Sequence, residues 1–414
     1  MARLPSSAPP TLPALMADEF RLDLEVITPM FGGSAETRAV NAEHPVRAAS
    51  VRGQLRFWWR ATAGAAFSTH KELLEAESLI WGRMATHAPE KDTSGKGTKD
   101  AAVDAGVGRV AISVETLTAG QRRSADQMPQ KAQMSYAIFP FQGNNQQSAA
   151  EYVEGARVRL TLRGLGSDRA AVLQALAAWV QFGGVGARTR RGCGSVRVIG
   201  GDALPALAMG SARSGQAWSL RPRVILFGAP KSSAFAAWQA ALMVYRDFRQ
   251  LPGFARNEGS GGRPGRSRFP EADTLRRFMR THSPEHRPLI DVDGFPRADL
   301  GLPIIFQFKD KRSGDPAQQS LEGATEGLLR FASPVITKVV ERDGQFVPML
   351  ALLDAPHVWE GRGGVRLKGR GGSIPKEQLQ LSESARREIR PLAGRPVREA
   401  LLEYARTQGF REAK

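Results

Sequence analysis

Residues 182–196 read FGGVGARTRRGCGSV, a segment with five glycines and three arginines between two apolar stretches. Glycine permits positive φ and a close approach of another backbone, and the planar arginine guanidinium suits phosphate. The segment follows a predicted helix and precedes a predicted strand. A dinucleotide-binding turn has the reverse order, and a P-loop ends in Gly-Lys-Ser/Thr. We therefore predict a loop that supports an extended nucleic-acid backbone, with a tight structural turn as the alternative.

The residues around this loop predict an α+β domain. Apolar residues alternate in the segments typical of half-buried strands and recur at helical spacing in the others. Strands are predicted at 20–26, 110–114, 158–162 and from 196, and helices at 51–67, 71–81 and 168–182. Ser167 or Asp168 is a candidate cap of the last helix. The resulting order, strand, helix, strand, strand, helix, strand, is the split βαββαβ arrangement of a ferredoxin-like unit.

The second half of the chain repeats this alternation. Strands are predicted at 224–227, 302–308, 335–340 and 346–353, and helices at 232–249, from Pro270 and at 396–406. Asp343-Gly344 is a hairpin signal between the last two strands. We therefore expect a second, related domain in tandem with the first.

Composition shifts along the chain suggest the domain boundaries. We predict a disordered leader at 1–18, an N-terminal domain at 19–200, a linker at 201–217 and a C-terminal domain at 218–414. Residues 86–106 are rich in Ser, Gly, Lys and Asp, which predicts a mobile insertion within the first domain.

The overall charge favours a polyanionic partner. The chain has 414 residues, with 58 Lys and Arg against 41 Asp and Glu, a formal net charge of +17. Nucleic acid is the commonest partner of so basic a chain, although a basic surface kept for solubility is the alternative. The single cysteine, Cys193, excludes an internal disulfide and fits the cytoplasm. No apolar run reaches the roughly 18 residues of a membrane span, so we expect no membrane association.

The first predicted helix carries a second basic cluster. Arg52, Arg56 and Arg60 are spaced by four residues, so they share a helix face, and Arg47 lies just upstream. No Asp or Glu occurs between residues 47 and 71. We therefore expect these arginines to be neutralised by phosphates rather than by the protein. A third basic segment, GSGGRPGRSRFPEAD at 259–273, precedes the helix that starts at Pro270.

Catalytic and metal-binding patterns are weak. The six histidines show no metal-ligand spacing such as HExxH, so we predict no metal, no cofactor and no catalytic residue. His44, just before the basic helix, is the candidate general base if the protein cleaves RNA. A surface histidine is the simpler interpretation.

Several motifs together resemble the RAMP proteins of type III-B (Cmr) CRISPR effector complexes, and most of all their first RAMP subunit. Besides the glycine-arginine loop they are VRAASVRGQLRFWWRATAG at 46–64, ITPMFGG at 27–33, GRSRFPEAD at 265–273, LGLPIIFQFK at 300–309 and RFASPVITK at 330–338. The chain departs from the family at Arg52, where lysine is frequent, and at Phe269, where tryptophan is common. Cys193 stands where the family suggests an aromatic residue.

The resemblance implies two tandem ferredoxin-like, RRM-like RAMP domains in a non-catalytic antiviral subunit. Such a subunit binds crRNA and target RNA near the crRNA 3′ region, beside other RAMP subunits. It implies RNA contacts from Arg47, Ser50, Arg52 and Arg56, and from Gly183, Gly184, Gly186, Arg188, Arg190, Arg191 and Gly192. To these we add Arg266 and Arg268 of the second-half basic loop. A RAMP endoribonuclease that processes CRISPR transcripts is the main alternative, and a basic scaffold without RNA contact is the other.

Overall fold

The computed structural model describes residues 18–83, 106–207, 220–260, 265–280, 288–308, 314–360, 363–370 and 372–412. All but the last residue of the predicted leader, nearly all of the predicted insertion at 86–106, and positions 208–217 of the predicted linker lie outside these ranges. Those three expectations therefore stay predictions. Among the described helices, none combines the length and apolar character needed to cross a membrane.

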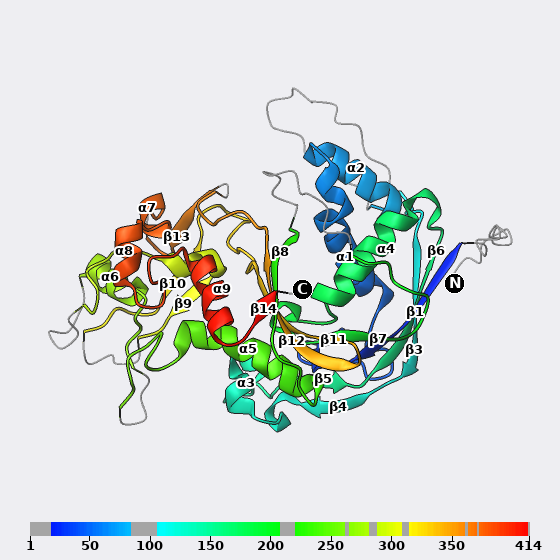
Figure 1. Ribbon diagram of the computed structural model, residues 1–414, viewed down its shortest axis with the longest axis horizontal. Helices are drawn as coiled ribbons and strands as arrows, with labels where there is room; N and C mark the ends of the chain where they lie inside the picture. The colour runs from blue at the N-terminus through cyan, green and yellow to red at the C-terminus, as the bar shows by residue number, and fades with distance from the viewer. Residues whose placement is uncertain are drawn as a thin grey trace, which may run out of the picture.

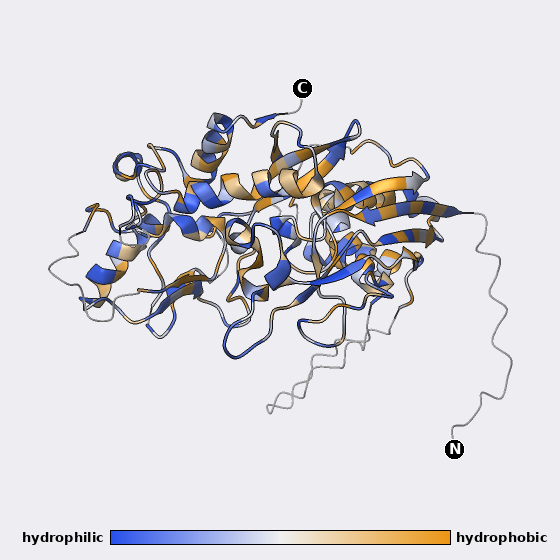
Figure 2. Ribbon diagram, turned by 90° about the horizontal axis from the view of Figure 1, so that it is seen from below, coloured by the Kyte–Doolittle hydropathy of each residue, from blue (hydrophilic) through white to orange (hydrophobic). Residues whose placement is uncertain are grey.

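The first half of the chain builds a four-stranded antiparallel sheet with two helices over one face (Figure 1). Its strands are β1 (Glu19–Val26), β3 (Ala111–Thr118), β6 (Arg157–Arg163) and β7 (Val196–Gly201), in the order β3-β6-β1-β7. Helices α1 (Ala48–Ala61) and α4 (Arg169–Phe182) cover the face to which Phe20, Leu22 and Leu24 point. The alternation of hydrophilic and hydrophobic residues along the strands is visible in Figure 2. The predicted order of strands and helices is confirmed here.

The opposite face of this sheet carries charged side chains that neutralise one another. Arg159 binds Asp23 with Nε to Oδ1 at 2.8 Å, Arg163 binds Glu19 at 2.8 Å and Arg157 binds Glu25 at 3.2 Å. Each of these arginines lies directly opposite its carboxylate on the neighbouring strand. Opposite charges at such positions favour the register, and they leave this face nearly neutral.

The second half repeats the same strand order. Its sheet contains β8 (Pro222–Phe227), β11 (Val335–Arg342), β12 (Gln345–Leu353) and β14 (Arg411–Glu412), in the order β11-β12-β8-β14. All neighbours are antiparallel. Helix α5 (Ala234–Gln250) follows β8, and α9 (Val397–Thr407) precedes β14. Both sheets therefore place their first, second, third and fourth strands in the same spatial order.

The second sheet is buried on both faces. Alternate residues of β11 and β12, among them Ile336, Met349 and Ala351, belong to the hydrophobic cluster of the first half. The residues between them, among them Leu350 and Leu352, join the cluster beneath α5 and α9. A strand that is buried on both faces has a continuous apolar sequence, and β12 contains such a sequence, VPMLALL. Apolar residues of both sheets therefore join one hydrophobic cluster.

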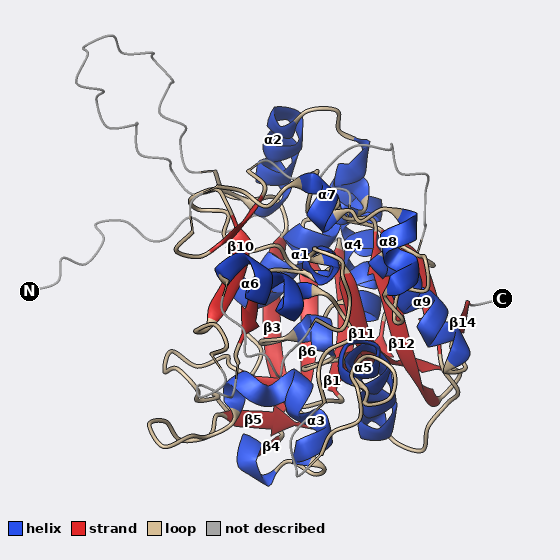
Figure 3. Ribbon diagram, turned by 90° about the vertical axis from the view of Figure 1, so that its left-hand side faces the viewer, coloured by secondary structure: helices blue, strands red, loops and turns tan. Residues whose placement is uncertain are grey.

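Smaller elements complete the structure (Figure 3). The remaining strands form two three-stranded sheets, β2 (Met30–Phe31) with β5 (Glu151–Glu154) and β4 (Gln121–Ser124), and β13 (Val365–Leu367) with β10 (Gln319–Gly323) and β9 (Ile304–Phe306). The remaining α-helices are α2 (His70–Trp81), α3 (Lys131–Ile138), α6 (Glu271–Met279), α7 (Lys376–Leu379) and α8 (Glu383–Glu388). Of these, only α2, the start of α6 near Pro270 and β9, which lies within the predicted strand at 302–308, were predicted.

Three local expectations can be compared with the structure. Asp343 and Gly344 have φ of 50° and 72°, which confirms the tight hairpin turn. The helix predicted at 51–67 ends at Ala61, because Thr62 caps it with a non-helical backbone and a 3₁₀ turn follows. Asp168, one of the two predicted candidates, is the N-cap residue of α4, but its side chain makes no capping hydrogen bond and its carboxylate accepts from Arg109 at 3.3 Å.

The glycine-arginine loop fastens the first half to α5 and β11. Gly192 has φ of +78°, and a Cβ there would lie 2.4 Å from Cδ1 of Trp238 and 2.9 Å from the carbonyl oxygen of Thr337. The Trp238 indole N–H donates to the carbonyl oxygen of Arg191 at 2.6 Å. Nη1 of Arg191 donates to the carbonyl oxygen of Val335 at 2.7 Å. Only glycine fits position 192, for reasons of conformation and of space.

Lys338 of β11 makes a second connection between the halves. Its side chain is fully buried, and Nζ donates to the carbonyl oxygens of Val180 at 2.6 Å and Gly183 at 2.7 Å. These carbonyls lie at the C-terminal end of α4, where unpaired oxygens and the helix dipole favour a cation. Burial lowers the pKa of Lys338 to about 7.

Replacement of Gly192 by alanine should destabilise the protein by roughly 2–4 kcal/mol, because strain at positive φ adds to the clash with Trp238. Two alanine variants are matched controls, to be compared by urea unfolding. Gly344 has a similar φ of +72°, but no atom lies within 4 Å of the position that a Cβ would take, so Gly344→Ala should cost only about 1–2 kcal/mol. Gly53 lies in α1 with open space around it, so Gly53→Ala should stabilise by about 0.5–1 kcal/mol. An equal cost at positions 192 and 344 would contradict the role given to Trp238.

The lowered pKa of Lys338 predicts a pH-dependent stability. Between pH 7 and about 10.5 the unfolded chain binds a proton at this lysine that the folded chain does not bind. Stability should therefore rise with pH across this window, by at most about 1.4 kcal/mol per pH unit. Measuring unfolding of the wild type and of Lys338→Met from pH 7 to 10 isolates the effect, since the variant lacks the titrating group. Parallel pH profiles of the two proteins would contradict it.

Candidate nucleic-acid interface

A cleft of about 1340 Å³ opens where the two halves meet. Its walls come from α3, the glycine-arginine loop, the C-terminal end of α5, and residues 300–307 and 330–333. Helix α3 lies beside α5 (Figures 1 and 3), so an element of the first half packs directly against the second. Three of the motifs noted in the sequence, at 182–196, 300–309 and 330–338, therefore converge on one cavity.

The cleft is rich in guanidinium groups. Six arginines line it: Arg188, Arg190, Arg191, Arg246, Arg249 and Arg330. Arg246 is paired with the neighbouring Asp247 at 2.6 Å. No carboxylate in the described part of the chain forms an ion pair with the other five. The cleft therefore concentrates positive charge that the protein leaves uncompensated, which attracts a polyanion.

The three loop arginines bind backbone carbonyls and aromatic rings. Arg188 donates to the carbonyl oxygen of Tyr136 at 3.0 Å, and its guanidinium lies 5.1 Å from the ring centre of Phe139. Arg190 donates to the carbonyl oxygen of Ser333 and lies over Phe57 of α1. Carbonyls and π-systems orient a guanidinium without cancelling its net charge. The loop arginines therefore shape the wall of the cleft and keep it positive.

The floor of the cleft is positive enough to alter the acidity of a tyrosine. Arg191 lies 4.2 Å from the ring centre of Tyr245, and Nη1 of Arg249 lies 3.1 Å from its hydroxyl oxygen. Burial raises the pKa of Tyr245, but the positive charges of Arg249 and Arg191 outweigh it and lower the pKa to about 8. For Arg190, burial and the neighbouring charge of Arg191 lower the pKa to about 10. The shift of Tyr245 reports crowded positive charge, whereas burial is the larger cause of the shift of Arg190.

The candidates on α1 are not brought into the cleft. Arg47 and Ser50 are exposed at the start of the helix. Arg52 and Arg56 line a separate cavity of about 360 Å³ beside Trp81 and Gly82.

The expectation that the basic face of α1 lacks a protein partner is wrong in part. Nε of Arg56 lies 2.5 Å from Oε1 of Glu77, and Nε of Arg60 lies 3.3 Å from Oε2 of the same carboxylate. Glu77 lies on α2, outside the stretch of sequence that lacks acidic residues. Its own side chain is almost fully buried. Tertiary packing of α2 against α1 therefore supplies the neutralising charge.

The candidates in the second-half basic loop also have protein partners. Arg266 binds Asp273 at 2.7 Å, and Arg268 donates to Oδ1 of Asn257 and to the carbonyl oxygen of Gly253, both at 2.8 Å. Neither arginine lines the cleft. These bonds fix the path of the chain between α5 and α6.

The loop glycines act mainly through packing. Gly183 and Gly184 are buried, and Gly186 is exposed. A Cβ at Gly186 would lie 2.3 Å from the carbonyl oxygen of Phe31, and the next residue, Ala187, donates its N–H to that oxygen at 2.9 Å. The loop is thus held against the ITPMFGG segment, and its glycines allow that approach.

Sequence reasoning missed most of the cleft. The missed residues are Tyr136, Phe139, Arg246, Arg249 and Arg330. Arg330 opens a motif already singled out, and Arg246 and Arg249 lie one helical turn apart at the end of a predicted helix. Those signals existed, but α3 was not predicted, so nothing in the sequence pointed to its aromatic residues.

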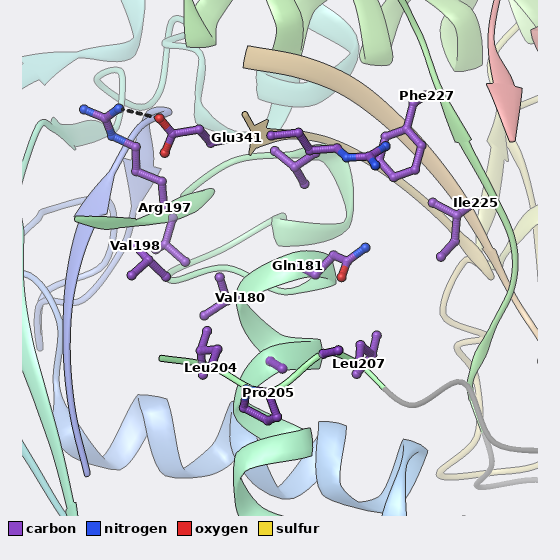
Figure 4. Close-up of a pocket in the computed structure, with 15 residues that line it drawn as sticks. Val180, Gln181, Arg197, Val198, Leu204, Pro205, Leu207, Ile225, Phe227 and Glu341 are labelled. Atoms are coloured by element: carbon purple, nitrogen blue, oxygen red, sulfur yellow. Dashed lines mark hydrogen bonds and ion pairs between the residues drawn. The ribbon is translucent and has the colours of Figure 1, made fainter. Parts of the chain in front are cut away.

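Another pocket, of about 520 Å³, lies between β7, β8, β11 and residues 204–207 (Figure 4). Its lining is mostly aliphatic. It has two arginines: Arg197 pairs with Glu341 at 3.1 Å, and Arg342 lies over Phe227. It suits phosphate less well than the arginine cleft.

Across the described ranges, no group of three or more His, Cys, Asp or Glu residues is placed to hold a metal ion.

Comparisons with known proteins agree with the motifs. The CRISPR system Cmr subunit Cmr1-1 of Pyrococcus furiosus is 31% identical over 163 residues, which are 38% of this chain and 42% of that protein. The match thus spans less than half of the relative's length. The crystal structure of apo Cmr1 from Pyrococcus furiosus aligns over 87% of this chain and 92% of that one, at 18% identity and a TM-score of 0.44.

A chain of the type III-B Cmr-beta complex bound to cognate target RNA aligns over 93% of this chain and 100% of its own length, at 9% identity and a TM-score of 0.39. The family model of the RAMP superfamily matches residues 23–197. That range holds the glycine-arginine loop, the whole of β3 and β6, the second half of β1 and the start of β7. Residues 23–197, less than half of the chain, are therefore similar to the RAMP superfamily.

Proposed function

We propose that this chain is a non-catalytic RNA-binding subunit of a type III-B CRISPR RNA-guided interference complex, acting in antiviral defence. The observation that carries the proposal is the arginine cleft, because three motifs distant in sequence build it together. The similarity of residues 23–197 to the RAMP superfamily and a curated relative named as a Cmr subunit support the biological setting.

The chemistry of the cleft favours RNA over a small ligand. Five uncompensated arginines line a cleft of about 1340 Å³, beside four aromatic residues. Phosphate contacts supply most of the affinity for a nucleic-acid backbone, and aromatic rings stack on bases. RNA has regularly spaced phosphate charges and flat bases, so it can bind both the arginines and the aromatic residues of this surface.

The fold supports a tandem RAMP architecture. Each half has four antiparallel strands in one shared spatial order, with a helix after the first strand and another before the fourth. We infer that both halves are ferredoxin-like, RRM-like domains. In the assembled complex the subunit would contact crRNA and target RNA near the crRNA 3′ end, next to other RAMP subunits, in the cytoplasm.

The arginine cleft predicts electrostatic RNA binding that is nearly blind to sequence. The affinity of the purified protein for a labelled RNA should fall steeply with salt, with a log–log slope of roughly 0.7 per phosphate contact. Arg249→Ala/Arg330→Ala should weaken binding by on the order of 100-fold and reduce the slope by about 1.4, if each arginine makes one charge-assisted contact. Fluorescence anisotropy between 50 and about 300 mM salt measures both quantities.

A matched control removes the same charge elsewhere. Arg387 and Arg406 are exposed, and each is paired with glutamate on the C-terminal helices or strand. Arg387→Ala/Arg406→Ala should leave the affinity nearly unchanged. An affinity independent of salt, or an equal loss in both double variants, would contradict the cleft as the RNA site.

The absence of catalysis is also a proposal, and His44 provides its test. This histidine is exposed before α1, and no described side chain hydrogen-bonds to its imidazole. Repeat RNA incubated with the protein in EDTA should stay intact on a denaturing gel, and His44→Ala should bind RNA as the wild type does. Cleavage that disappears in His44→Ala would instead favour the RAMP endoribonuclease.

A further inference from the structure

One aromatic ring in the cleft is exposed without an evident structural reason. Among the large apolar side chains that are exposed in the described part of the chain, Phe139 is the one aromatic ring, and it is 62% exposed. It lies at the end of α3 and lines the cleft. An exposed phenylalanine in a basic cleft has to be explained by what binds there.

The turn that carries Phe139 is rigidly held. Arg38 donates to the carbonyl oxygens of Pro140 at 3.0 Å, Phe141 at 3.0 Å, Gln142 at 2.9 Å and Ser148 at 2.9 Å. Phe141 stacks on Phe31, with ring centres 3.9 Å apart and an angle of 9° between the rings. Four hydrogen bonds from one guanidinium and a stacked anchor fix this backbone. The exposure of Phe139 is therefore a property of the folded structure.

One face of the Phe139 ring is already occupied. The Arg188 guanidinium lies 5.1 Å from the ring centre and is fixed by its bond to the carbonyl oxygen of Tyr136. Because Phe139 is 62% exposed with this cation over its ring, a flat group can still reach the ring. A base that stacks there would also bring its phosphates into the field of the unpaired arginines.

We propose that Phe139 is a stacking platform for an unpaired nucleobase, so that the cleft selects single-stranded over duplex RNA. This inference rests on the proposed function and adds the state of the RNA that the cleft accepts. Bases within a duplex are stacked on both sides and cannot lie on a protein ring, whereas unpaired bases can. The uncompensated arginines favour RNA over an apolar protein segment as the occupant.

The test uses the full-length protein with a labelled single-stranded RNA and the corresponding duplex of equal length. Phe139→Ala should weaken binding of the single strand by roughly 5- to 100-fold, the range that loss of one stacked base gives. The salt slope should not change, because no charge is removed. Phe139→Trp should restore affinity, and duplex binding should be weak in all variants. Leu79→Ala removes an apolar side chain that is 54% exposed on α2 and should have no effect.

The outcomes separate the two proposals. Unchanged single-strand affinity in Phe139→Ala, together with a loss in Arg249→Ala/Arg330→Ala, would overturn the stacking platform and leave the RNA cleft in place. Equal affinity for duplex and single-stranded RNA would also overturn the stacking platform and leave the RNA cleft in place. No RNA binding by the wild type at low salt would overturn both. A loss in Phe139→Ala that tryptophan does not restore would assign the residue to folding and overturn the inference.

Discussion

The ammonium group of Lys338 and two carbonyl oxygens at the end of α4 form the contact on which the relation of the two halves depends. An isolated buried cation would be too costly to retain in an apolar core. The C-terminal end of a helix provides both free acceptors and a favourable dipole. Through this lysine, β11 lies directly against the end of α4.

The cleft follows from this arrangement. The loop after α4 is drawn between the first half and β11, where its arginines find carbonyls and rings of the second half. No carboxylate in the described structure pairs with these arginines, so their positive charge remains available to a ligand. The same residues thus join the halves and create the surface that we assign to RNA.

The sequence predicted what depends on local pattern. Most strands and helices of the two four-stranded units could be inferred from apolar periodicity, and the hairpin turn from Asp343-Gly344, but the two-residue strand β14 was not predicted. Contacts between side chains that are far apart in the sequence could not be inferred. Glu77 of α2 neutralises arginines of α1, and Asp273 and Asn257 bind arginines of the second basic loop. Counting charges along the sequence therefore overestimated the number of arginines without a partner in the protein. The α3 helix has little amphipathic character and was missed, although it supplies Tyr136 and Phe139.

The paired charges on the open face of the first sheet have a kinetic consequence. RRM-type domains use that face, with exposed aromatics, to stack RNA bases. Here Arg157, Arg159 and Arg163 each pair with a carboxylate of β1, so the face exerts little long-range attraction on a polyanion. A diffusing RNA is then steered by the remaining positive field, which is strongest where arginines lack partners. If the cleft binds RNA as we propose, the nearly neutral sheet raises the share of encounters that begin at the cleft.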